Sequence, residues 1–315
     1  MSSPAQWPPA CTEYNPNYPS QYGYRPNLGL SIAFVIIFGL ICIAHGFQMW
    51  RYRTPWMIFF VVGSGLESLG WIARAVGHTC SYSRPLFTMQ TAVLIMGPAW
   101  TQAGIYITLW VIIVLLGRDV SPLPPRTYLL ICACVDIVCL ALQATGGGLA
   151  GAAYQAGKST QPGTTTMVVG IIAQLVLTCI FSCILSIVVW RGAPRIRKNK
   201  PMLRVVSVTV LAAAMMIMRG VYRSIELAEG WRGKLITVEV YVVVLDAVPM
   251  IIAMGAYVFT PPAKLLRDQG ASMKIDGTLI QPHDDVHMAA EIGSGSGSGS
   301  GTDVEKEDVP VVAVR

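Results

Sequence analysis

The stretch 203–228, LRVVSVTVLAAAMMIMRGVYRSIELA, decides the fold class of this chain. A membrane-spanning helix needs about 20 mostly apolar residues, and this stretch is long and apolar enough although it carries Arg219, Arg223 and Glu226. The three charged side chains follow one another at i, i+4 and i+7, so they share one face of a helix. A charge near the middle of a spanning helix costs about 2.5–3.5 kcal/mol on insertion scales. The stretch therefore predicts a spanning helix whose charged face points into a helix bundle and away from lipid.

Composition extends this prediction to the whole chain. Hydrophobic residues make up 53% of its 315 residues and charged residues only 13%, against about 25% charged residues in soluble domains. Seven stretches are long and apolar enough to span a membrane, and short connections favour antiparallel neighbours. The chain is therefore predicted to be an all-α membrane protein, a bundle of seven transmembrane helices. The predicted spans are approximately 27–49, 55–77, 89–117, 128–148, 166–190, 203–228 and 235–259.

Lysine and arginine residues are unevenly distributed between the two sides of this predicted bundle. Twelve lie in the connections after the first, third and fifth spans and at the start of the C-terminal tail, and five lie on the opposite side. Because cytoplasmic loops carry the excess of Lys and Arg, the N-terminus is predicted to be extracellular and the C-terminus cytoplasmic. The connection 191–204 contributes most to this prediction.

Three parts of the chain follow from these assignments. Residues 1–26 form a polar extracellular tail, which lacks the basic segment and apolar core of a cleaved signal peptide. Residues 27–260 form the transmembrane domain. Residues 261–315 are expected to be a disordered cytoplasmic tail, because they are polar and contain a strict Gly-Ser alternation at 293–301.

Further ionisable side chains fall inside the other apolar stretches, again on single helix faces. Glu67 and Arg74 are seven residues apart in the second span, and Glu239 and Asp246 are seven apart in the seventh. Given the predicted orientation and a rise of about 1.5 Å per residue, most of these groups lie between the bilayer midplane and its outer surface. The candidates for binding a substrate or a proton are Glu67, Arg74, Asp136, Gln143, Arg219, Arg223, Glu226, Glu239, Asp246 and His45.

The charges of this set do not balance, because five carboxylates face three guanidinium groups within the predicted spans. Depth alone predicts that Arg74 pairs with Glu226 and that the two arginines of the sixth span pair with the acids of the seventh. Two interpretations stay open: the polar faces line a cavity, or they form buried ion pairs that hold the helices together. The excess of acids favours a cavity or a protonated carboxyl group.

Several other function classes are disfavoured by the sequence. The segment 151–159, GAAYQAGKS, has five residues between its glycines where a phosphate-binding loop has four, and it lies in a predicted outside loop. His45 is the one histidine inside a predicted span, which is too few for a zinc hydrolase, and the seventh span has no lysine for a retinal Schiff base. We therefore expect no enzyme activity, no metal, no cofactor and no nucleic-acid partner.

Two of the eight cysteines, Cys11 and Cys80, fall in polar segments that are predicted to be extracellular. Disulfides persist in that environment. A bridge between these two cysteines would tie the N-terminal tail over the connection between the second and third spans. Two free thiols are the alternative.

The polar residues of the spans fall into short motifs. They are Tyr14-Asn15-Pro16 before the first span, His45, Glu67-Ser-Leu-Gly70-Trp71-Ile-Ala-Arg74, Pro98 with Tyr106, Asp136 with Gln143 and Gly146-Gly147-Gly148, Arg219 with Tyr222, Arg223 and Glu226, and Glu239 with Tyr241, Asp246 and Pro261. In this combination the chain resembles, over roughly residues 14–265, the fungal RTA-like family of lipid-translocating exporters associated with resistance to aminocholesterol. One departure is Trp110-Val111, where the family commonly has Gly-Arg.

The resemblance implies export or flipping of sphingoid long-chain bases and resistance to toxic amphiphiles, in the plasma membrane or, alternatively, another endomembrane. The ammonium head of such a base would meet the acids Glu67, Asp136, Glu239 and Asp246, while its tail stays in lipid. Because the sequence has no ATP site, movement would run downhill or be coupled to protons. The alternative is a receptor-like sensor of such lipids that changes resistance without transport. Membrane lipids or amphiphilic small molecules are the expected partners in both cases.

Overall fold

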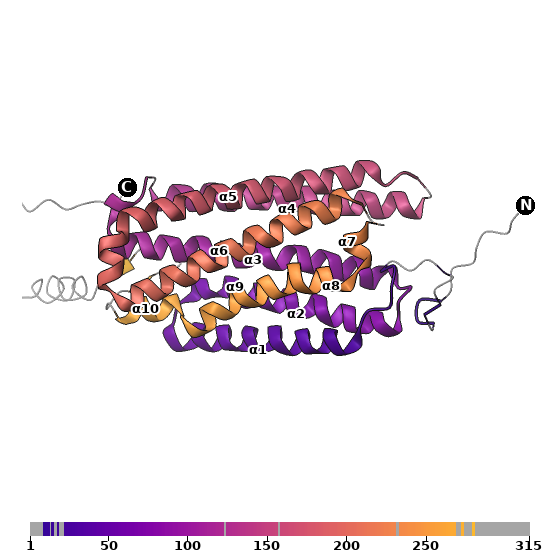
Figure 1. Ribbon diagram of the computed structural model, residues 1–315, viewed down its shortest axis with the longest axis horizontal. Coiled ribbons are helices and arrows are strands. Elements are labelled where there is room, and N and C mark those ends of the chain that lie inside the picture. Colours follow the sequence, from indigo (N-terminus) through magenta and orange to yellow (C-terminus); the bar gives the residue numbers. More distant parts are fainter. Residues whose placement is uncertain are drawn as a thin grey trace, which may run out of the picture.

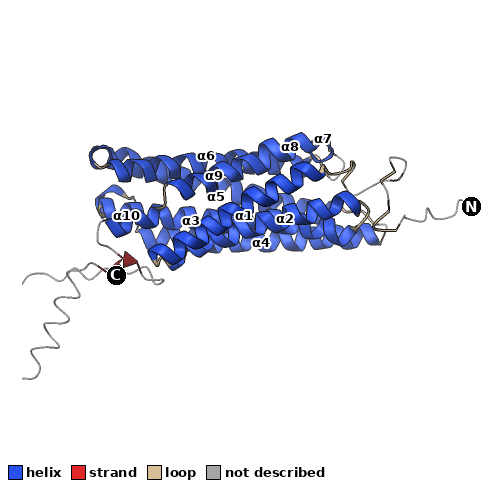
Figure 2. Ribbon diagram, turned by 90° about the horizontal axis from the view of Figure 1, so that it is seen from below, coloured by secondary structure: helices blue, strands red, loops and turns tan. Residues whose placement is uncertain are grey.

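The computed structural model describes residues 9–12, 14–15, 18, 22–122, 124–156, 158–230, 233–268, 272–273 and 279–280. These residues form an elongated bundle whose helices run along its length (Figure 1 and Figure 2). We call the end at which α1 begins the N-terminal end of the bundle, and the opposite end the C-terminal end.

The elements follow one another along the chain without long connections. They are α1 (Leu28–Tyr52), η1 (Pro55–Met57), α2 (Ile58–Thr79), α3 (Arg84–Leu116), η2 (Arg118–Val120), α4 (Pro125–Gln155), α5 (Gln161–Lys198), α6 (Lys200–Ala228), α7 (Lys234–Thr237), α8 (Glu239–Val242), η3 (Val243–Ala247), α9 (Val248–Phe259), α10 (Pro262–Asp268), β1 (Ser272–Met273) and β2 (Leu279–Ile280).

Seven helical segments of the described chain are long and apolar enough to cross a membrane, which confirms the predicted seven-helix architecture. The seventh of these segments is formed by α8, η3, α9 and the start of α10. Large apolar side chains such as Leu40, Ile43 and Trp190 are exposed on the outside of the bundle. Apolar surface of this extent marks a membrane contact. The chain is therefore an integral, multi-pass membrane protein.

The central helix of the bundle is α3. Within its most apolar window 78% of the residues are buried, against 28% for α1 and for α4. A helix that is apolar on all sides can lie among other helices or face lipid, and the burial of α3 shows that it lies among other helices. α2, α4 and α6 all pack against α3, and Tyr106, Leu109 and Ile112 of α3 are completely buried. This helix is the scaffold on which the polar site is built.

α4 and α5 approach each other through glycines. A Cβ atom added at Gly146 would lie 2.6 Å from the backbone nitrogen of Met167, and one added at Gly163 would lie 2.4 Å from that of Ala150. Small residues let helices in a membrane pack with their backbones close together. Gly148, two residues from Gly146, has nothing within 4 Å of such a Cβ position.

The loop predicted between the fifth and sixth spans is largely helical. α5 continues through Pro194 to Lys198, and Asn199 is the one residue between α5 and α6. The Asn199 side chain accepts a hydrogen bond from the Met202 backbone N–H at 3.2 Å and so caps α6. The basic residues of this region therefore extend two helices beyond their apolar segments. The basic residues of this region led to the prediction of a loop between two spans. Charged residues that lie in water are nevertheless compatible with a helix.

The seventh span begins at Glu239, after a break in the chain, where the sequence predicts one continuous helix over 235–259. α7 ends at Thr237, Val238 is extended with φ −114° and ψ 109°, and α8 begins at Glu239. The break could not be predicted from the apolar composition of the region, because valine occurs both in membrane-spanning helices and in extended backbone. The break allows Glu239 to begin a new helix at the N-terminal end of the bundle.

The predicted disorder of the C-terminal tail, residues 261–315, is wrong for its first residues. α10 buries Ala263 and Leu265, which are 1% and 3% exposed, and it packs against α1, α3 and α6. Two apolar side chains that meet an available packing surface are enough to order this short helix. β1 and β2 form a small antiparallel pair. The Gly-Ser alternation at 293–301 lies outside the described residues.

The N-terminal strap, by which we mean the described residues between Pro9 and Asn27, lies against the N-terminal end of the bundle. Cys11 and Cys80 are joined by a disulfide bond, the first of the two alternatives considered above. The backbone N–H of Asn15 donates to the Tyr82 hydroxyl at 2.9 Å, and this hydroxyl donates to the Asn15 carbonyl at 3.0 Å. The strap is thus attached where α2 ends and α3 begins.

The strap continues along α2 to the start of α1. The Pro26 carbonyl oxygen lies 2.7 Å from Nδ1 of His78. Gly77 allows the strap to come close, because a Cβ atom there would lie 2.7 Å from the Tyr22 hydroxyl oxygen. Tyr22 itself is 2% exposed. The strap therefore contributes a buried side chain to the bundle.

Candidate functional site

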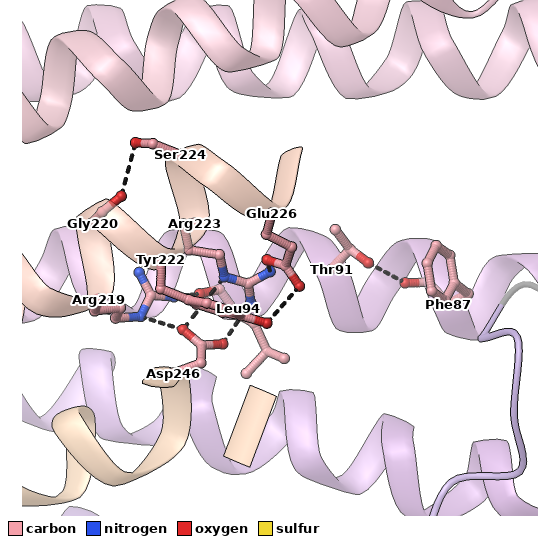
Figure 3. A network of polar contacts seen from close by, with 10 residues as sticks. All are labelled: Phe87, Thr91, Leu94, Arg219, Gly220, Tyr222, Arg223, Ser224, Glu226 and Asp246. Atoms are coloured by element: carbon pink, nitrogen blue, oxygen red, sulfur yellow. Dashed lines mark hydrogen bonds and ion pairs between the residues drawn. The ribbon is translucent and has the colours of Figure 1, made fainter. Parts of the chain in front are cut away.

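Charged side chains of α6 and η3 meet inside the bundle (Figure 3). Nε of Arg219 lies 2.6 Å from Oδ1 of Asp246, and Nη2 of Arg223 lies 2.6 Å from Oδ2 of the same residue. Asp246 is 4% exposed and Arg219 is 8% exposed. A single buried carboxylate therefore holds two guanidinium groups, and the predicted pairing of these arginines with Asp246 agrees with the structure.

A second acid completes this group. Nη1 of Arg223 lies 2.8 Å from Oε2 of Glu226, and the Tyr222 hydroxyl donates to Oε1 of Glu226 at 2.8 Å. Two arginines and two acids therefore balance in charge. We call Arg219, Arg223, Glu226 and Asp246 the ion-pair network.

The ion-pair network is anchored to α3 through a carbonyl group that the helix itself leaves free. Pro98 has no N–H, so it cannot donate to the carbonyl of Leu94, four residues earlier. Nη2 of Arg219 donates to this carbonyl oxygen at 2.6 Å. Within a membrane, every backbone polar group needs a partner inside the protein. The side chain of Arg219 therefore supplies the hydrogen bond to the Leu94 carbonyl that Pro98 cannot donate.

Asp246 lies on an irregular turn. η3 is π-helical, and the Val248 N–H bonds to the Val243 carbonyl, five residues earlier. Pro249 follows and cannot donate the next backbone bond. Single π-helical turns within longer helices are frequent at functional sites. The turn places the acid of the ion-pair network on a segment that is less regular than α6 opposite.

A separate ion pair lies closer to the N-terminal end. Nη2 of Arg74 is 3.0 Å from Oε1 of Glu239 and also donates to the Tyr24 hydroxyl. The guanidinium carbon lies 5.5 Å from the ring centroids of Tyr24 and Trp71, within cation–π range. Two predicted pairings are therefore wrong, because Arg74 does not meet Glu226 and Glu239 does not meet the arginines of α6. Depth in the bilayer, on which those predictions rested, does not reveal which helices are neighbours.

The strap covers a cavity of about 50 Å³ at this end of the bundle. The Tyr22 hydroxyl donates to Oε1 of Gln90 at 2.9 Å. Burial raises the pKa of Tyr22 to about 12, although the nearby Arg74 acts in the opposite direction, so the hydroxyl keeps its proton at neutral pH. The polar lining of this first cavity comes from Tyr22, Tyr24, Gln90, Thr91, Arg74, Arg223 and Glu226.

A second cavity of about 40 Å³ lies among α3, α4, α5 and α6. Gln102, Gln143 and Gln174 supply its amide lining. Nε2 of Gln143 donates to Oε1 of Gln174 at 2.9 Å, whereas neither amide atom of Gln102 has a hydrogen-bond partner among the described residues. Arg223 borders both cavities, so the ion-pair network lies between them.

Two buried acids remain outside the ion pairs that the structure describes. Glu67 on α2 is 1% exposed and Asp136 on α4 is 5% exposed. In the described part of the chain, Oε1 of Glu67 and both carboxyl oxygens of Asp136 have no hydrogen-bond partner. Arg219, Arg223 and Asp246 act on Glu67 electrostatically, without a direct contact. The excess of acids over arginines that the sequence shows is therefore located at these two positions.

His45 lies apart from the other candidates. Its Nε2 is 3.2 Å from the Met254 carbonyl oxygen, and its ring stacks on Phe60 with 5.3 Å between ring centroids. These contacts join α1, α2 and α9. His45 borders neither of the two cavities described above.

Tyr22, Tyr24 and Gln90 belong to the site, although sequence reasoning missed them. The two tyrosines were assigned to a tail outside the membrane domain, and no periodicity connects that tail to a helix face. The available signal was the abundance of tyrosine and proline before the first span. Rings of this kind are suited to cover a buried cation such as Arg74.

Residues 60–269 match the family described as RTA1 like protein. The chain belongs to this family. The match confirms the resemblance that the motifs of the spans predicted, and it covers the ion-pair network, both unpaired acids and the glutamines of the second cavity. The first helix and the strap precede the matched residues of this RTA1-like protein.

Named relatives of the RTA1-like protein come from Saccharomyces cerevisiae. The sphingoid long-chain base transporter RSB1 is 28% identical over 302 residues, which cover 84% of this chain and 79% of the relative. Protein RTM1 is 28% identical over 236 residues, 69% of this chain and 72% of its own. Protoporphyrin uptake protein 1 is 26% identical over 219 residues, 65% of this chain and 69% of its own. No solved structure matches this RTA1-like protein.

Proposed function

We propose that this RTA1-like protein moves sphingoid long-chain bases, or similar cationic amphiphiles, from one membrane leaflet to the other. The observation that supports the proposal most is the pair of buried acids, Glu67 and Asp136, which stand outside the described ion pairs. A buried carboxylate without a counter-charge is costly, so each of these groups needs a proton or a cation. The printed names of two relatives, a sphingoid base transporter and a protoporphyrin uptake protein, both concern amphiphiles.

The chemistry of a long-chain base suits these two acids. Its ammonium head can pair with a carboxylate inside the bundle, while its tail remains in lipid. Glu226, Glu239 and Asp246 are occupied by arginines, which leaves Glu67 and Asp136 to receive the head group. When the ammonium binds, the carboxyl group releases its proton, and when the ammonium leaves, the group takes up a proton again. Movement of the base in one direction is thereby linked to movement of a proton in the other.

We further propose that the N-terminal end of the bundle faces the outside of the cell, and that the protein resides in the plasma membrane. The Cys11–Cys80 disulfide lies at this end, and disulfides persist on the extracellular side. The excess of Lys and Arg in connections at the other end points to the same orientation.

The proposal is tested with purified protein reconstituted in liposomes. We expect the protein to accelerate the movement of a labelled long-chain base between leaflets, relative to liposomes without protein. Glu67→Gln and Asp136→Asn should each lower the initial rate at least about tenfold, since each removes a charge-assisted contact worth about 1.5–3 kcal/mol. The matched control is Asp119→Asn, which neutralises an acid that is 63% exposed and pairs with Arg195, and it should retain the rate of the unmodified protein.

The alternative function, a lipid sensor, predicts a different result in the same liposome experiment. A sensor would bind the labelled base, and Glu67→Gln would weaken that binding, but leaflet-to-leaflet movement would equal that of protein-free liposomes. Binding without flux would therefore overturn the transporter proposal and favour the sensor.

A further inference from the structure

Three buried side chains between α3 and α4 contain five polar atoms that lack hydrogen-bond partners in the described structure. They are both amide atoms of Gln102, the hydroxyl of Tyr106 and both carboxyl oxygens of Asp136. Gln102 is 1% exposed, Tyr106 is completely buried and Asp136 is 5% exposed. Buried polar groups in proteins nearly always have partners, so a cluster of this kind is suited to bind a polar group.

The three side chains are neighbours. Gln102 and Tyr106 are one helical turn apart on α3, so they share a face. The Tyr106 hydroxyl lies beside both the Gln102 amide and the Asp136 carboxyl group, although it meets hydrogen-bond geometry with neither. The cluster therefore forms a continuous polar surface from Asp136 to Gln102.

The cluster meets the second cavity at Gln102, which lines that cavity together with Gln143 and Gln174. A water molecule needs about 10–15 Å³ of such a volume, so the cavity of about 40 Å³ admits about three groups of that size. Arg219 and Arg223 border the same cavity, but Asp246 and Glu226 oppose their charges. Gln143 and Gln174 bond to each other, so the free polar groups are the Gln102 amide at the cavity and, beyond it, the Tyr106 hydroxyl and the Asp136 carboxylate.

The carboxylate and the amide differ in the hydrogen-bonding groups that they bind. A carboxylate accepts hydrogen bonds from an ammonium group, whereas an amide both donates and accepts. Hydroxyl groups also donate and accept, so an amide can satisfy a hydroxyl in either direction. An ammonium group with hydroxyls on neighbouring carbons would therefore match the carboxylate of Asp136 and the amide of Gln102 at once.

We propose that the Gln102–Tyr106–Asp136 cluster recognises the hydroxyl groups of the head group and selects long-chain amines that carry hydroxyls next to the amine over plain long-chain amines. This inference rests on the proposed function and assigns its specificity. A site built to hydrogen-bond a hydroxyl discriminates against an analogue without it, because the buried polar groups are then left without partners. Asp136 alone would accept both kinds of amine.

The test compares two substrates of equal chain length in liposomes, a 2-amino-1,3-diol and an unsubstituted primary amine. The unmodified protein should move the diol at least about tenfold faster than the plain amine, the factor expected for one net hydrogen bond. Gln102→Met keeps the length of the side chain but removes its donor and acceptor, and it should abolish most of this preference. Tyr106→Phe should reduce the preference in the same direction.

The control is Gln48→Met, which removes another buried glutamine, one that donates to the Val258 carbonyl at 2.7 Å and lines neither cavity. It should keep the preference of the unmodified protein. Equal rates for the two amines in the unmodified protein, or an unchanged preference in both Gln102→Met and Tyr106→Phe, would overturn the inference while the transport proposal stands. If neither amine moves faster than in protein-free liposomes, the proposed function itself fails.

Discussion

At the scale of single residues, Asp246 is the side chain on which most of the buried charge depends. Its two oxygens contact Arg219 and Arg223 at 2.6 Å each. Removing one member of a buried ion pair is strongly destabilising, because it leaves the partner without a counter-charge. Here one substitution would affect two arginines: Arg223 would keep its contact with Glu226, whereas Arg219 would keep its hydrogen bond to the Leu94 carbonyl but no acid in direct contact among the described residues.

Asp246→Asn should therefore lower the free energy of unfolding by about 3–5 kcal/mol. The measurement is thermal or denaturant unfolding in detergent. Asp119→Asn is the control, because its exposed pair with Arg195 is expected to contribute within about 1 kcal/mol. If the two variants unfold alike, the ion-pair network is not a stabilising element of the bundle.

Sequence reasoning found the charged residues and the helix faces but not all of their partners. The spacing of Arg219, Arg223 and Glu226 fixed their common face, and this face does meet the seventh span. The partner of Arg74 could not be found in this way. It is Glu239, which lies at the start of α8 beyond a break in the chain, and a helix of uniform rise does not reveal that break.

At the scale of elements, the contact between α4 and α5 depends on individual glycines. The run from Gly146 to Gly148 looks uniform in the sequence, yet its members differ in their surroundings. Gly146 faces the backbone of α5, whereas Gly148 has open space around its Cβ position. The three-dimensional contact alone distinguishes the two positions.

Gly146→Ala should destabilise the protein by about 1–3 kcal/mol, the usual cost of overpacking. Its added methyl group would meet the Met167 backbone nitrogen, and this backbone cannot move without shifting α5. Gly148→Ala, in the same helix, should be neutral or stabilising by up to about 1 kcal/mol, because alanine is the better helix former. Unfolding midpoints of the two variants in detergent provide the comparison, and equal midpoints would contradict the close approach of α4 and α5.

At the scale of the whole molecule, the disulfide links a segment before the bundle to the end of α2. Cys11 and Cys80 are 69 residues apart in the sequence. A loop of this length corresponds to about 4 kcal/mol in the chain-entropy description of an unfolded chain. The value is an upper bound, because helices that persist in a membrane-like environment restrict the unfolded state further.

Cys80→Ser should lower the unfolding midpoint, and Cys11→Ser should lower it by the same amount. The double substitution should add nothing, since both single variants remove one bond. Cys134→Ser is the control, because Cys134 is an exposed free cysteine. Mass measurement without reductant detects the bond directly, and two free thiols there would contradict the observed linkage.

The break at Val238 has a consequence for how the first cavity is enclosed. The Cys11–Cys80 disulfide ties the strap to the end of α2, and Tyr22 and Tyr24 of the strap line the first cavity. α7 and α8 form a corner on either side of an extended residue, and Ile236 and Val242 of this corner line the first cavity opposite Tyr22 and Tyr24. The extended backbone of Val238 separates the two helices of this corner. The Arg74–Glu239 ion pair and the Asn27 N–H bond to Glu239 tie the start of α8 to α2 and to the strap, so a single carboxylate joins the segments that border the first cavity.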